Sequence, residues 1–204
     1  MQEMFGAQNT EVVSALMMRA TLELAEHRGE AALATAKLII STSEAMEGAE
    51  SDYALGGYAH LMYAWRMLGD ENKAAEVAKR AFTLSLKNHP ADDPATVYSQ
   101  GNWAESLVRL KRYEEARVVL ERIMAIVAGG KDVDKSPLMG ARLALVRVIV
   151  ETGVSRQREP KHELAELKGW VAEAKAFFDP KPTEREYAEE AGKLAVALAG
   201  FSQP

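Results

Sequence analysis

The sequence predicts an all-α protein, an α-solenoid of about four antiparallel helical hairpins followed by a C-terminal capping helix. Apolar residues recur at helical spacing along almost the whole chain. Glycines and prolines interrupt that spacing where turns between helices would be needed. The pattern of the segment that begins at Leu61 also recurs 42 residues later, in the segment that begins at Trp103. Such self-similarity is typical of stacked repeats, in which each hairpin covers its apolar face with the next one.

Start and stop signals define the expected helices. Asp93 can cap a helix whose first position is Pro94. Thr183 and Glu186 have the spacing of a capping box at the start of the last helix. The run Val146–Val150 favours a strand, but its flanks have helical spacing, so we expect a buried helical segment there. The expected helices cover residues 12–28, 31–46, 52–68, 72–87, 95–110, 114–127, 137–151, 161–178 and 183–199.

Composition excludes several classes of protein. The 204 residues include no cysteine, which removes disulfides, thiolate metal sites and cysteine nucleophiles and fits a reducing cytoplasm. Asp and Glu exceed Lys and Arg by 30 to 25, for a net charge of −5, without the clustered basic excess of a nucleic-acid surface. The first ten residues are polar and do not resemble a secretory signal, and no apolar stretch is long enough to span a membrane.

The repeat organises the chain into a single domain, residues 1–204. We expect hairpin units at about 10–49, 51–90, 94–130 and 136–179, with the capping helix at 183–199. Trp65, Leu107 and Ile149 fall at one repeat position and should fill the space between helices. Gly29 lies 40 residues before the turn glycine Gly69, so matching these two glycines makes the first unit slightly shorter than the others.

These units resemble tetratricopeptide repeats (TPRs). With Gly69 as the turn glycine, the chain has the family's leucine, aromatic and two small residues at Leu61, Trp65, Ala74 and Ala81. The next unit has Trp103, Leu107, Ala116 and Ile123 at these positions and Tyr113 at the family's turn tyrosine. The stretch from His89 to Ile126 is similar to the 42-residue repeats of the kinesin light chain class, which also occur in bacterial scaffold and kinase-associated proteins. The resemblance implies a right-handed superhelix that binds proteins.

The resemblance also implies a partner-binding surface on the concave face. In this family the first helix of each hairpin lines a groove that binds an extended peptide or a partner helix. Asn102 matches an asparagine that holds a peptide backbone, and the arginines would form a stripe that attracts carboxylates. The family's two-lysine clamp for chaperone C-termini is missing, because Gly101 and Leu143 stand at its positions. The positions that transfer to this chain are His60, Tyr63, Arg66, Tyr98, Asn102, Glu105, Arg109 and Arg147.

Catalytic patterns are absent from the sequence. The four histidines are far apart and lack metal-ligand spacing, and no glycine-rich phosphate loop is present. We expect the Gly56-Gly57 pair to permit close packing of helices rather than to form a phosphate-binding loop. We therefore expect a non-catalytic protein–protein interaction scaffold, cytoplasmic and bacterial, without cofactor, metal, nucleic acid or membrane, that binds a protein or peptide partner. The alternatives are a self-associating structural module that forms a homo-oligomer, the repeat region of a larger bacterial kinase or transcriptional regulator, and an enzyme with an unrecognised all-α site.

Overall fold

The computed structural model describes residues 2–48, 51–129, 135–152, 164–181 and 185–200, with side chains described from residue 10 onward and not at 128 and 129. Within these ranges the chain forms nine helices and no strand, which confirms the all-α prediction. They are α1 (Gln2–Ala25), α2 (Gly29–Glu47), α3 (Asp52–Met67), α4 (Glu71–Asn88), α5 (Pro94–Arg109), α6 (Tyr113–Gly129), α7 (Ser136–Thr152), α8 (Leu164–Phe178) and α9 (Arg185–Gly200).

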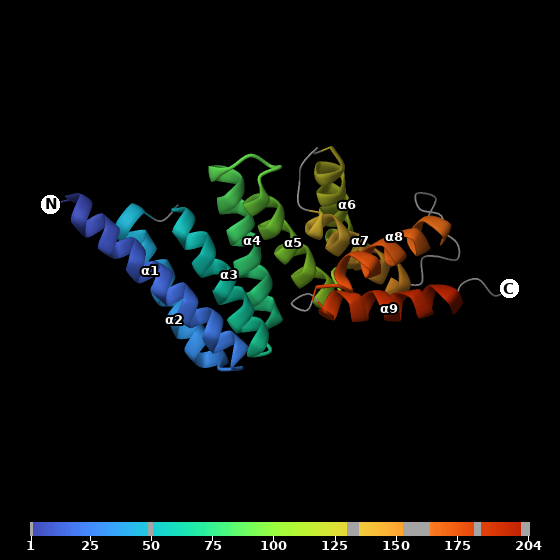
Figure 1. The fold of residues 1–204 in the computed structure, drawn as a ribbon, viewed down its shortest axis with the longest axis horizontal. Helices are drawn as coiled ribbons and strands as arrows, with labels where there is room; N and C mark the ends of the chain where they lie inside the picture. The colour runs from blue at the N-terminus through green and yellow to red at the C-terminus, as the bar shows by residue number, and fades with distance from the viewer. Residues whose placement is uncertain (1, 49–50, 130–134, 153–163, 182–184, 201–204) are drawn as a thin grey trace. The chain divides into compact units, whose positions relative to one another are not determined.

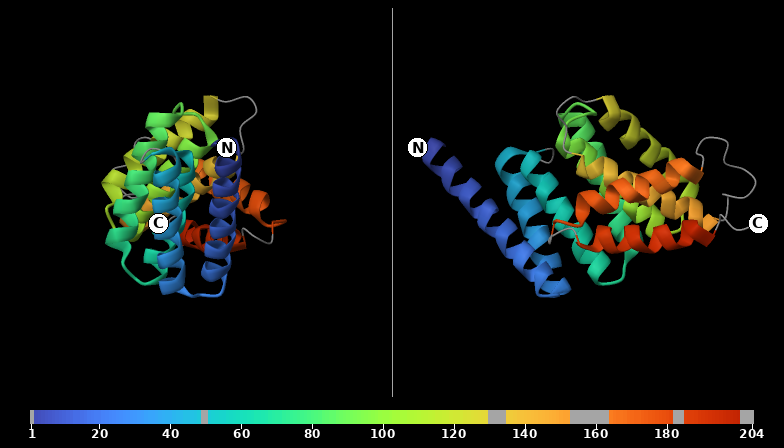
Figure 2. Two further views of the ribbon diagram at one scale, coloured as in Figure 1. Left: turned by 90° about the vertical axis from the view of Figure 1, so that its left-hand side faces the viewer. Right: turned by 45° about the vertical axis from the view of Figure 1, so that its right-hand side comes forward.

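The chain divides into two compact units. Unit 1 is Met1–Leu110 and contains α1 to α5, and unit 2 is Lys111–Pro204 and contains α6 to α9. In unit 1 each helix packs against the next one in the chain, and α1 also packs against α3. Figures 1 and 2 show α1 to α5 as adjacent antiparallel helices, with α1 at one edge of the unit. In unit 2, α7 packs against α6, α8 and α9, and α9 lies against both α7 and α8.

Most predicted helix bounds agree with the structure to within a few residues. The largest difference is in α1, which starts at Gln2, about ten residues before the expected start. The predicted helix began at Val12, the first apolar residue in helical register. The helix extends further toward the N-terminus because the residues before Val12 include no proline to interrupt it. Asp93 caps α5 as expected, because its Oδ1 accepts a hydrogen bond of 2.8 Å from the Ala95 N–H. The predicted cap Thr183 lies outside the described residues.

The backbone turns reveal the repeat more clearly than the sequence does. His27, Gly69 and Lys111 have φ angles of 57°, 80° and 58°, and they follow one another at intervals of 42 residues. Each of the three follows the end of a helix, α1, α3 or α5, in the left-handed conformation, which costs a non-glycine residue free energy. The match of Gly29 to Gly69 was therefore wrong, and the first unit needs no change of length.

Buried residues follow the same 42-residue register. Ala32, Ala74 and Ala116 are fully buried at equivalent positions, where their small side chains let neighbouring helices approach closely. Leu107 and Ile149 are buried as predicted for their shared position. The third member, Trp65, is partly buried against the core of unit 1, with the Lys73 ammonium 4.2 Å from its ring centroid. These observations confirm that the shared position faces a core.

Helix α7 is buried almost all round, as the run of β-branched residues requires. Val146, Val148 and Ile149 all lie in the core of unit 2. A helix that is apolar on most of its surface is stable only when other helices cover it, and α6, α8 and α9 do so. The prediction of a buried helical segment at Val146–Val150 is confirmed.

Glu23 gives α1 a buried charge whose titration should affect stability. Its side chain is 2% exposed. Burial raises the pKa of Glu23, but the nearby Thr35 hydroxyl, the hydrogen bond and charge of Arg19 and the charge of Arg28 outweigh this, so its pKa lies below its ordinary value. Because the folded pKa is depressed, the unfolded chain takes up the proton first as the pH falls. The stabilisation is complete above the ordinary pKa of about 4.3 and is lost as the pH falls through the folded pKa.

We therefore expect Glu23→Gln to lower the free energy of unfolding by about 1–3 kcal/mol at neutral pH, because the hydrogen-bonded ion pair between Arg19 and this buried charge is lost. The difference from the wild type should shrink as the pH falls below about 4. Urea unfolding at a series of pH values measures both quantities. A difference that stays constant down to the lowest pH at which the chain folds would contradict this assignment.

Candidate functional site

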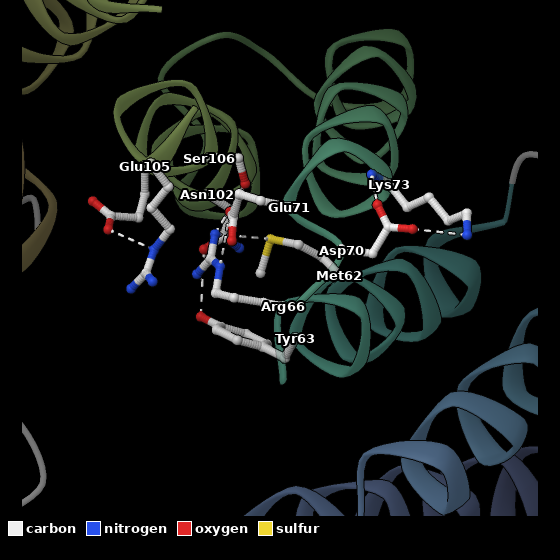
Figure 3. A network of polar contacts seen from close by, with 10 residues as sticks. Met62, Tyr63, Arg66, Asp70, Glu71, Lys73, Asn102, Glu105 and Ser106 are labelled. Atoms are coloured by element: carbon white, nitrogen blue, oxygen red, sulfur yellow. Dashed lines mark hydrogen bonds and ion pairs between the residues drawn. The ribbon is translucent and has the colours of Figure 1, made fainter. Parts of the chain in front are cut away.

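Seven of the eight predicted partner-binding residues lie on two neighbouring first helices of hairpins in unit 1. Residues three or four apart share one side of a helix, so the spacing places three of them together on α3 and four together on α5. We call this surface the α3–α5 face, part of which is shown in Figure 3 with Tyr63, Arg66, Asn102 and Glu105 labelled. It comprises His60, Tyr63 and Arg66 on α3 and Tyr98, Asn102, Glu105 and Arg109 on α5.

Two tyrosines and an amide connect the helices across the face. The hydroxyl oxygens of Tyr63 and Tyr98 are 3.1 Å apart. The Tyr63 hydroxyl also donates to the Oδ1 atom of Asn102 over 3.4 Å. The NH2 group of Asn102 has no acceptor among the described residues, and Tyr98 is 53% exposed. The centre of the face therefore presents a hydrogen-bond donor beside an open aromatic ring.

Arg66 is bound closely by its own unit. Its Nη2 donates to the Ser106 hydroxyl over 2.9 Å, and its Nε donates to Glu71 over 3.3 Å. The guanidinium carbon lies 5.6 Å from the centre of the Tyr63 ring, and the Arg66 side chain is only 14% exposed. Figure 3 shows the guanidinium between Tyr63 and these partners. Arg66 thus joins α3, α4 and α5 and leaves little of its charge to a ligand.

Arg109 is more exposed but also paired. Its Nε lies 3.0 Å from Glu105 Oε1, one helical turn earlier on α5, and its side chain is 47% exposed. Each arginine of the face in unit 1 therefore has a carboxylate beside it, Glu71 of α4 for Arg66 and Glu105 of α5 for Arg109. The expected arginine stripe is thus accompanied by carboxylates of the same unit.

His60 extends the network to α1. One ring nitrogen, Nδ1, is 2.8 Å from the Gly56 carbonyl oxygen, and Nε2 is 3.0 Å from the Thr21 hydroxyl. Both nitrogens of the ring therefore have partners, and Nδ1 is the donor in its bond because the Gly56 carbonyl oxygen can only accept. The residues of the face thus connect three successive first helices, α1, α3 and α5.

Sequence reasoning missed three residues that complete this network. Ser106 lies one turn after Asn102 on the same side of α5, so helical spacing alone could have found it. Glu71 sits in the first turn of α4, and Thr21 sits on α1. Nothing in the local pattern distinguishes these two from other polar residues, because the contacts they make join different helices.

Arg147, the eighth predicted residue, belongs to α7 in unit 2. Its Nη1 lies 3.2 Å from Glu190 Oε1 of α9. The two side chains line a pocket of about 510 Å³ between α7 and α9, together with Glu151 and Lys193. A second bond reaches this region from α6, where the Tyr113 hydroxyl donates to Glu151, and this bond raises the pKa of Tyr113. The carboxylate that Arg147 was expected to find in a partner is supplied by α9.

In the described parts of the chain, no group of three or more His, Cys, Asp or Glu side chains could hold a metal ion. Among the described helices, none combines the length and the apolar character needed to cross a bilayer.

Comparison with known proteins identifies the fold. No family model matches the chain, and no curated protein matches it. Two crystal structures of a kinesin light chain-like protein of Podosopora anserina, with nearly identical TPR-like repeats, superimpose with TM-scores of 0.69 and 0.68 at 16% identity, over 94% of this chain and 88% of theirs. BtubC (BKLC) from P. vanneervenii superimposes with a TM-score of 0.58 at 15% identity, over 100% of this chain and 94% of that one. The chain therefore has the fold of a TPR-like helical repeat protein.

Proposed function

We propose that this protein is a non-catalytic interaction scaffold whose α3–α5 face binds a segment of a protein partner. TPR-like folds are suited to this role, because stacked hairpins present their first helices side by side over an extended surface. The partner segment would lie across α3 and α5 as an extended peptide or a helix, in the concave groove that the repeat resemblance implies. We further propose a cytoplasmic, bacterial protein, in keeping with the cysteine-free composition and the likeness to a repeat class that also occurs in bacterial proteins.

One observation carries this proposal, namely the group formed by Tyr63, Tyr98 and Asn102. A buried structural network would hide such groups, but the Tyr98 ring is half exposed and Asn102 retains its two N–H donors. A peptide backbone offers carbonyl acceptors at regular intervals, which an amide can meet. Tyrosines are enriched at protein interfaces because one ring provides apolar area together with a hydroxyl.

We expect the double variant Tyr98→Ala/Asn102→Ala to weaken partner binding by about 30-fold, since loss of interface hot spots costs about 2 kcal/mol or more. The partner is first isolated by pull-down from native lysate, and its affinity is then measured by titration calorimetry with the wild type and the variant. Asn72→Ala, which changes an exposed asparagine on α4 outside the face, is the matched control. Circular dichroism checks that both variants remain folded.

Equal affinity of the double variant and the wild type would show that the partner binds elsewhere. The assignment of the α3–α5 face would then be wrong, even if the pull-down had identified a partner.

A further inference from the structure

The arginines of the α3–α5 face are already paired with carboxylates of the same unit, and from this we infer that the partner segment is an uncharged, extended stretch of protein chain. This inference rests on the proposed function and adds the chemistry of the partner. It departs from the sequence-based expectation that Arg66 and Arg109 attract carboxylates.

Arg66 has little capacity for a new anion. Its donors face Ser106 and Glu71, its plane lies near the Tyr63 ring, and it is largely covered. A ligand carboxylate would have to displace Glu71 and leave that carboxylate partly buried without its cation. Breaking one side of such a pair is costly, because the remaining charge is left unpaired in a poorly hydrated place.

Arg109 is open to solvent, but Glu105 accompanies it. An arriving carboxylate would meet the attraction of Arg109 and, within a few ångströms, the repulsion of Glu105. At the effective dielectric constant of a protein surface these two terms are of similar size and opposite sign. The net attraction for an acidic segment is therefore small, and salt in the buffer reduces it further.

The groups that remain available are neutral. The Asn102 amide can donate to peptide carbonyls, and the exposed Tyr98 ring can cover an aliphatic side chain or a proline. An extended, uncharged segment satisfies both, because its alternate carbonyls point toward the face without a charge to desolvate. The chemistry of the face thus favours recognition of backbone and apolar side chains.

A random peptide library displayed on phage, selected on the 204-residue chain and depleted on its Tyr98→Ala/Asn102→Ala variant, tests the inference. The face-dependent peptides should contain Asp and Glu no more often than the unselected library. Their affinities should change by less than about threefold between about 50 and about 500 mM NaCl, because no ion pair is formed on binding. Face-dependent peptides rich in Asp and Glu, whose binding falls about tenfold with salt and requires Arg109, would overturn the inference.

A second measurement uses a variant in which Arg109 has lost its carboxylate partner. Glu105→Gln removes the accompanying carboxylate and keeps the size of the side chain. This variant should bind fluorescein-labelled hexaglutamate at least about fivefold more tightly than the wild type, and Glu105→Gln/Arg109→Gln should lose the gain. Glu76→Gln, an exposed position on α4, is the matched control. Equal binding of hexaglutamate by the wild type and Glu105→Gln would refute the pairing argument.

The two proposals fail in different ways. If no selected peptide depends on Tyr98 and Asn102, the proposed function of the face is wrong, and the inference about its partner falls with it. If face-dependent peptides are found and they are acidic, the proposed function stands and only the inference about charge is overturned.

Discussion

Gly57→Ala is expected to lower the free energy of unfolding by about 1–3 kcal/mol, the usual cost of forcing an extra methyl group into a packed core. A Cβ atom at this position would lie 2.6 Å from Ile40 Cγ1, 3.0 Å from Ile39 Cγ2 and 3.2 Å from the Ile40 backbone nitrogen. The backbone atom cannot move without displacing α2, so the clash is not relieved by a change of rotamer. Urea unfolding followed by circular dichroism measures the effect.

The neighbouring Gly56→Ala provides a matched control. Its Cβ would lie 2.4 Å from the Cε atom of Met17, but that atom is the end of a flexible side chain that can turn aside. Alanine is also favoured over glycine inside a helix by about 0.5–1 kcal/mol. Gly56→Ala should therefore be close to neutral, and equal destabilisation by both substitutions would refute the close approach of α3 to α2.

Leu107→Ala is expected to destabilise the protein by about 2–5 kcal/mol, the range for a large-to-small change in a core. Leu107 is 0% exposed, in the α5 helix of unit 1. The loss combines the transfer free energy of the deleted methyl groups with the cavity that they leave. Chemical unfolding of the variant and the wild type gives the difference in free energy directly.

The control for this prediction is Leu38→Ala, the same substitution at a half-exposed position on α2. It should cost less than about 1 kcal/mol, because water already covers much of that side chain. Similar losses for both leucines would mean that the shared repeat position of Leu107 does not face a packed core.

Local chemistry made the helices and their repeat predictable. Asp93 and Pro94 specify the start of α5, and the actual cap forms as expected. Gly57 permits the approach of Ile40, in keeping with the predicted close packing at the Gly56-Gly57 pair. These features depend on residues within one or two turns, or on a periodicity that is visible along the chain. The first unit was misaligned because its turn uses His27, and a histidine is a much weaker signal for a left-handed backbone than a glycine.

The chemistry of the α3–α5 face could be predicted only in part. Helical spacing correctly grouped Tyr98 with Asn102 and Tyr63 with Arg66, since residues on one side of a helix stay together. It could not show that Arg66 pairs with Glu71 and Ser106, because those contacts join three helices. The same limit applies to Arg147, whose partner Glu190 lies on α9.

The sequence by itself determined the class of fold, the length of the repeat and the residues that share each helix face, because these follow from local propensity and periodic burial. Only the tertiary structure decided that Arg66 and Arg147 are already paired with carboxylates of other helices, Glu71 and Glu190. An arginine has the same appearance in a sequence whether its carboxylate comes from a partner or from a neighbouring helix. The free energy of an ion pair depends on distances of a few ångströms between groups far apart in the chain, and packing alone sets those distances.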